Sequence, residues 1–158
     1  MKYHKVTPRE IWDKNKLLIV SAVTIITLFF PTGFAHELGH ILVCVSNGYD
    51  YKLTVGELAL KTQCSNTPQP ILLYFALGGT FGLISSVMLF LLPIVRKNKG
   101  VFIGVSITAF DHFLKTIFET VQHNGYVSNS NVVLVIMSIP LIAFWFVLLW
   151  FFSQRSKK

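Results

Sequence analysis

The sequence predicts an all-α membrane protein with about four transmembrane helices and a small β-hairpin between the first and the second. Hydrophobic residues make up 53% of the 158 residues and charged residues only 13%. This balance is too apolar for an ordinary soluble domain. Four apolar stretches are separated by short polar ones, and three of them are close to the roughly 20 residues that one membrane crossing needs. We therefore expect a single transmembrane domain spanning residues 1–158.

The first apolar stretch, residues 17–46, is longer than one crossing requires. A helix of this length extends about 45 Å, whereas the hydrocarbon core is about 30 Å thick. Pro31 and Gly33 lie inside the stretch, so a long helix that is tilted, or bent near Pro31, competes with a short membrane-dipping segment followed by a second helix. The basic start and the Gly33-Phe34-Ala35 sequence also resemble a signal-peptidase site, although apolar sequence resumes at once.

The polar stretch after the first segment, residues 47–70, has the pattern of a β-hairpin. Residues 51–55 and 58–61 alternate between apolar and polar positions on either side of Gly56. Such a strand pair could offer an edge to an extended peptide, or it could only cap the helices. The two cysteines, Cys44 and Cys64, are too few for a disulfide framework, so a disulfide and two free thiols both remain open.

The other three apolar stretches, residues 71–95, 101–121 and 132–152, each fit one crossing. Gly78 and Gly82 have the small-xxx-small spacing that lets membrane helices approach closely. We therefore predict that these glycines serve helix packing.

The basic residues outside the apolar stretches alternate between dense and sparse loops. Three dense groups lie before the first stretch (Lys2, Lys5, Arg9, Lys14, Lys16), between the second and the third (Arg96, Lys97, Lys99) and after the fourth (Arg155, Lys157, Lys158). The hairpin region contains only two isolated lysines, Lys52 and Lys61. Positive charge marks cytoplasmic loops, so this alternation predicts both termini in the cytoplasm. The formal charge of +7 is then explained by topology and anionic lipid rather than by nucleic acid.

The segment His36-Glu37-Leu38-Gly39-His40 is the strongest functional pattern in the chain. Residues four apart share a helix face, so His36 and His40 can both bind one metal ion. Glu37 lies beside that face, where it can act as general base toward a metal-bound water, as in H-E-x-x-H zinc hydrolases. Polar groups at membrane depth are costly and indicate function. The pattern predicts a zinc site (Zn2+); the alternative is a pair of buried, hydrogen-bonded histidines.

A third ligand has to come from another segment, because catalytic zinc usually takes three protein ligands. The third apolar stretch offers a polar stripe with a four-residue repeat: Asp111, Lys115, Glu119 and His123. Asp111 lies about 15 Å along this helix, near mid-membrane, where an unpaired carboxylate is costly. We predict Asp111 as the third ligand, ahead of His112 and Glu119. An Asp111–Lys115 ion pair would need no metal.

Several of these features together resemble the site-2 protease family of intramembrane zinc metalloproteases. They are the sequence Ala-His-Glu-Leu-Gly-His-Ile-Leu at residues 35–42, the Asn-Gly-Tyr at 47–49, the Val-Gly at 55–56 and the glycine-rich residues 77–82. The resemblance covers roughly residues 27–119. It implies hydrolysis of peptide bonds in a membrane-embedded protein or peptide substrate.

The resemblance also implies roles for single residues: His36, His40 and Asp111 would be the zinc ligands and Glu37 the base. The chain departs from the family around Asp111, since Phe110 and His112 flank it where the family has a following glycine and an upstream Asn and Pro. Two other functions therefore compete. One is a catalytically silent relative that binds or scaffolds a membrane protein. The other is a metal-transport component.

Overall fold

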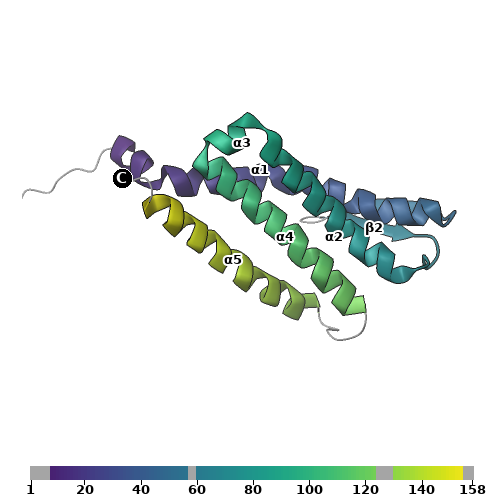
Figure 1. Ribbon diagram of the computed structural model, residues 1–158. Helices are drawn as coiled ribbons and strands as arrows, with labels where there is room; N and C mark the ends of the chain where they lie inside the picture. Colours follow the sequence, from purple (N-terminus) through teal and green to yellow (C-terminus); the bar gives the residue numbers. More distant parts are fainter. Residues whose placement is uncertain (1–7, 57–59, 124–129, 155–158) are drawn as a thin grey trace, which may run out of the picture.

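The computed structural model describes residues 8–56, 60–123 and 130–154 (Figure 1). The elements in chain order are α1 Pro8–Ser46, β1 Tyr51–Val55, β2 Leu60–Cys64, α2 Ile71–Met88, η1 Leu89–Leu91, α3 Pro93–Lys97, α4 Lys99–His123 and α5 Ser130–Gln154. Among the described residues, four helices are long and apolar enough to cross a membrane. The predicted all-α membrane fold with a small hairpin is confirmed.

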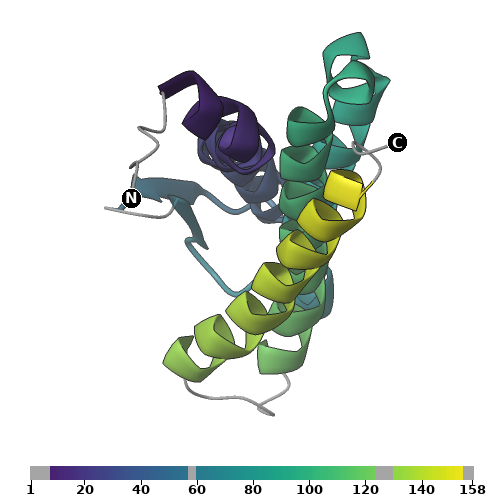
Figure 2. The same cartoon turned by 90° about the vertical axis from the view of Figure 1, so that its left-hand side faces the viewer.

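Helix α1 is one continuous helix of 39 residues that contains Pro31. The chain therefore has the long-helix arrangement, not a membrane-dipping segment followed by a separate helix. A helix of this length extends about 58 Å, well beyond the hydrocarbon core of about 30 Å. Figures 1 and 2 show α1 crossing α2 and α4 obliquely. The charged first turns of α1 can lie outside the hydrocarbon core, and tilt accommodates part of the remaining length.

Helix α2 ends at Met88 rather than continuing to residue 95, so the predicted single segment over residues 71–95 was too long. A 3₁₀ turn follows, and Leu92 adopts an extended backbone conformation before α3 begins at Pro93. Proline cannot donate the backbone hydrogen bond that would continue the helix, but it is well suited to the first position of a new one.

The hairpin pairs β1 with β2 in antiparallel register, with Tyr51 opposite Cys64 and Val55 opposite Leu60. The first strand matches the predicted one. The second predicted strand began at residue 58; residues 57–59 lie outside the described part of the chain, and the observed strand runs from Leu60 to Cys64. A disulfide joins Cys44 at the end of α1 to Cys64, which settles the pairing that the sequence left open.

The core lies where α1, α2 and α4 meet. Its buried apolar side chains come mainly from α4, including Ile103, Val105 and Ile107, with Val43 from α1. Helix α5 lies along α4 at one side of the bundle (Figure 1), and Trp150 on its outer face is 65% exposed. Large exposed apolar side chains on membrane-spanning helices suit contact with lipid.

Glycine sets the distance between α1 and α2. A Cβ at Gly39 would overlap the backbone carbonyl of Leu77 and the backbone nitrogen of Gly78. Because those atoms belong to the main chain of α2, the two helices would have to separate to accommodate any side chain at this position. Because residue 39 has no side chain, the face of α1 that carries His36 and His40 can pack directly against α2.

We predict that Gly39→Ala lowers the free energy of unfolding of the metal-free protein by about 1–3 kcal/mol, because it overpacks the α1–α2 contact. Gly33→Ala is the matched control on the same helix, since a Cβ there would lie 4.0 Å from Leu60 Cδ1, an ordinary contact. Thermal unfolding in detergent, followed by circular dichroism, measures both. Equal effects of the two substitutions would contradict the proposed helix contact.

Candidate metal centre

The two histidines of the α1 motif direct their Nε2 atoms toward the same point. His36 and His40 are each 6% exposed, and their Nε2 atoms lie 3.1 Å apart. This follows from their spacing of one helical turn. Glu37 is also 6% exposed, and its Oε1 lies 4.0 Å from His36 Nε2. These three residues can each offer one ligand atom within 4.8 Å of the others.

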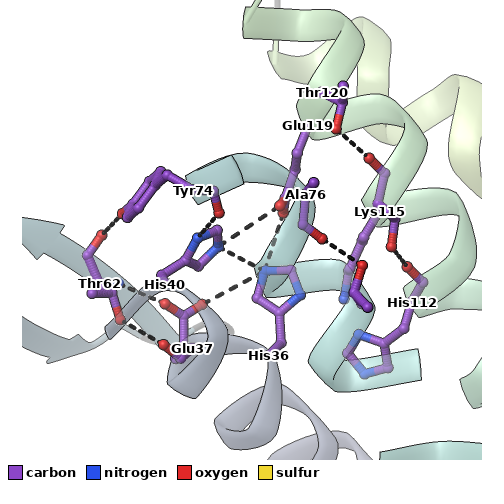
Figure 3. Close-up of polar contacts among 12 residues, drawn as sticks. His36, Glu37, His40, Thr62, Tyr74, Ala76, His112, Lys115, Glu119 and Thr120 are labelled. Atoms are coloured by element: carbon purple, nitrogen blue, oxygen red, sulfur yellow. Dashed lines mark hydrogen bonds and ion pairs between the residues drawn. The ribbon is translucent and has the colours of Figure 1, made fainter. Parts of the chain in front are cut away.

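Glu119 on α4 brings a carboxylate to the same place (Figure 3). Its Oε1 lies 3.2 Å from His36 Nε2, and its Oε2 lies 3.7 Å from His40 Nε2. Oε2 is buried and accepts no hydrogen bond within the described part of the chain. Sequence reasoning placed Glu119 only third among the α4 candidates, although the four-residue polar stripe contained it.

Asp111, the predicted third ligand, has a different partner. Its Oδ2 lies 2.8 Å from Lys115 Nζ, one helical turn further along α4. The carboxylate still lines the cavity that reaches His36 and Glu119, but within the described part of the chain its ion pair is with Lys115 and not with His36 or His40. The side chain of His123, the last member of the polar stripe, lies outside the described part.

Helix α2 supports His40 from two sides. The backbone carbonyl of Tyr74 accepts a hydrogen bond from His40 Nδ1 at 2.8 Å. A carbonyl can only accept, so the proton of the neutral ring sits on Nδ1, and Nε2 keeps a lone pair that faces His36 Nε2 at 3.1 Å. A Cβ at Gly78 would overlap the Nε2 edge of the same ring. The predicted packing glycine therefore also makes room for the ring nitrogen that would bind a metal.

Strand β2 holds Glu37. The backbone N–H of Thr62 donates a hydrogen bond to Glu37 Oε2 at 2.7 Å, and the Tyr74 hydroxyl donates to the Thr62 carbonyl at 2.9 Å. Tyr74 thus connects the strand beside Glu37 to the helix that supports His40 (Figure 3). The sequence predicted Glu37 only as a general base, whereas the structure also gives its carboxylate a contact with the backbone of β2. The hairpin therefore does more than cap the helices.

Two cavities reach the cluster. The first, of about 510 Å³, lies between α1, α4 and α5 and is lined by mostly apolar side chains such as Phe29 and Leu141. The second, of about 540 Å³, lies between α1, β2 and α2 and includes Thr62. His36, Glu37 and Glu119 line both, so the cluster is open toward the membrane-spanning part of α5 and toward the hairpin.

The donor set fits a divalent metal ion. Two imidazole nitrogens and one carboxylate oxygen are the ligands of many catalytic zinc sites, which keep a further position open. His36 Nε2 carries at most one proton and faces two acceptors, His40 Nε2 at 3.1 Å and Glu119 Oε1 at 3.2 Å, while Glu119 Oε2 is buried without a donor among the described residues. A buried acceptor without a donor is unfavourable. Bringing a cation between these acceptors would remove that cost.

Comparisons of the chain with models of protein families, with curated proteins and with solved structures gave no match.

We predict that replacing both cysteines by serine loosens β2 beside Glu37. For a sequence separation of 20 residues, the chain-entropy contribution of the disulfide is about 3 kcal/mol. Hydrogen–deuterium exchange by mass spectrometry should show faster exchange in peptides covering residues 60–64, with residues 103–114 of α4 as the internal control. Unchanged exchange in β2 would mean that the Thr62 and Tyr74 contacts suffice without the disulfide.

Proposed function

We propose that the chain is an intramembrane zinc metalloendopeptidase that hydrolyses peptide bonds of membrane-embedded substrates. The observation that carries this proposal is the meeting of His36, His40 and Glu119 around one point, with a second carboxylate, Glu37, beside them. All four residues lie in helices apolar enough to cross a membrane. The resemblance of residues 35–42 to the site-2 proteases supports the same activity.

In this proposal His36, His40 and Glu119 hold the zinc ion. Glu119 is preferred to Asp111 because its carboxylate lies against both imidazoles, whereas that of Asp111 is paired with Lys115. Glu37 is kept for proton transfer because Thr62 already occupies one of its oxygens. Zinc in such a site supplies Lewis-acid chemistry, acidifying water and polarising a carbonyl.

Glu37 is the general base of the proposed reaction. The bond from Thr62 fixes Oε2 and leaves Oε1 facing His36. Oε1 accepts a proton from the attacking water and then returns it to the leaving amine, which restores the carboxylate. The scissile peptide bond has to leave its helix first, because a helical backbone is shielded by its own hydrogen bonds.

A binding or scaffold protein without hydrolase activity is the second candidate. One observation favours it: the Glu37–Thr62 hydrogen bond gives Glu37 a structural use that needs no chemistry. Glu37→Gln separates the two candidates, because an amide oxygen can still accept the Thr62 N–H but cannot act as a base.

We further propose that both termini face the cytoplasm. The start of α1, the α3 turn and the end of α5 lie at one end of the bundle, and the hairpin lies at the other (Figure 1). Arg96 and Lys97 lie at this first end, in α3, as the positive-inside rule requires of a cytoplasmic face. The Cys44–Cys64 disulfide supports this orientation, because disulfides persist on the oxidising side of a membrane.

We predict that Glu119→Gln loses zinc and that Asp111→Asn keeps it. Both substitutions replace a carboxylate on α4 with an amide of the same shape, but only Glu119 contacts the imidazoles. After loading and dialysis, zinc content by mass spectrometry should be about one per chain in the wild type and in Asp111→Asn. The reverse pattern would make Asp111 the third ligand.

We predict that Glu37→Gln retains zinc and loses peptidase activity by about 100-fold or more, the contribution expected of a general base. The assay uses zinc-loaded protein in detergent with dye-labelled casein and with single-span peptides that carry a central Gly-Pro break. Chelation by 1,10-phenanthroline should stop cleavage, and added zinc should restore it.

Two results would contradict the peptidase proposal. One is full activity in Glu37→Gln, which would show that the carboxylate is not the base. The other is stoichiometric zinc without cleavage of any of these substrates, which would favour the binding or scaffold protein.

A further inference from the structure

The two histidines of the candidate metal centre are supported unequally. His40 donates its Nδ1 proton to the Tyr74 carbonyl, as metal-binding histidines almost always do with their second nitrogen. The Nδ1 atom of His36 is buried and has no hydrogen-bond partner among the described residues. On the Nδ1 side, His40 therefore has the acceptor that favours a metal-binding tautomer, and His36 has none among the described residues.

His112 of α4 is in position to be that group. Its ring centre lies 5.7 Å from that of His36, and the two rings are tilted by 33°. His112 is 2% exposed, and its Nδ1 also lacks a partner within the described part of the chain. Figure 3 shows His112 on the side of the His36 ring away from His40 and Glu119. From there it can contact His36 without competing for the metal.

Helix α2 seats the His112 ring. A Cβ at Gly82 would overlap this ring, as one at Gly78 would overlap the ring of His40. The two glycines lie one helical turn apart, so α2 accommodates the two imidazoles in the same way. A position that only filled space would be better served by an apolar side chain, because an imidazole buried without a partner is unfavourable.

We propose that His112 is the positioning residue of His36: a water molecule in the cavity that both side chains line accepts a hydrogen bond from His36 Nδ1–H and donates one to the His112 ring. The bond from His36 Nδ1–H fixes the tautomer of His36 with the proton on Nδ1, so that Nε2 presents its lone pair toward His40 Nε2 and Glu119. The inference rests on the proposed metal centre but does not depend on peptidase activity.

The test is the zinc affinity of His112→Phe, measured by competition with a chromophoric chelator in detergent. This variant keeps a ring of similar size and removes both nitrogens. We expect its zinc affinity to fall by about 10–100-fold, the usual effect of losing the partner of a ligating histidine. His112→Asn or His112→Gln, which keep an acceptor, should recover part of the loss. Thr108→Val, one turn away on the same cavity, is the control and should bind as the wild type does.

A second readout separates positioning from packing. With Co²⁺ in place of zinc, the visible absorption bands of His112→Phe should shift relative to the wild type, while thermal unfolding of the metal-free protein stays unchanged. If His112→Phe is not recovered folded, His112→Met, which also lacks the nitrogens, replaces it.

Three outcomes overturn the inference. The first is unchanged zinc affinity in His112→Phe. The second is a loss of zinc affinity in His112→Phe that is equally large in His112→Asn and His112→Gln. A wild-type protein that binds no zinc at all overturns the metal centre itself and, with it, the proposed function. Zinc content of the wild type therefore distinguishes failure of the proposed function from failure of the role given to His112.

Discussion

Charged and titratable side chains inside a membrane need partners, and this constraint explains most of the polar contacts in the chain. Glu37 is met by the Thr62 N–H, Asp111 by Lys115, and His40 by the Tyr74 carbonyl. The exceptions are grouped together: Glu119 Oε2, His36 Nδ1 and His112 Nδ1 are buried without hydrogen-bond partners in the described part of the chain. A cluster of buried polar atoms without hydrogen-bond partners is what we expect of a site that binds a ligand.

The sequence predicted the parts of this site that depend on one helix alone. His36 and His40 share a face because they are four residues apart, and the structure has them there. The choice between Asp111 and Glu119 depends instead on how far α4 is displaced along α1. That displacement is set by contacts between distant segments, such as Gly104 against Thr24, which no local pattern reveals.

The same distinction applies to the fold. Apolar length predicted the four long helices, and alternation predicted the hairpin. Helix α1 passes through Pro31 without interruption, since membrane-spanning helices tolerate proline where neighbouring groups satisfy the freed backbone carbonyl. Helix α2 has already ended at Met88 when Pro93 starts α3, and the extended conformation of Leu92 is the one that a following proline favours. The Cys44–Cys64 disulfide forms because the hairpin folds back on the end of α1. The composition of the loop could not predict this arrangement.

The most direct test of the account is X-ray absorption at the zinc edge of the zinc-loaded protein in detergent. The account predicts a nearest shell of nitrogen and oxygen at about 2.0–2.2 Å, outer-shell scattering from two imidazoles, and no sulfur, since both cysteines are in the disulfide. A sulfur shell, scattering from fewer than two imidazoles, or failure to take up stoichiometric zinc would contradict a metal centre built from His36, His40 and Glu119.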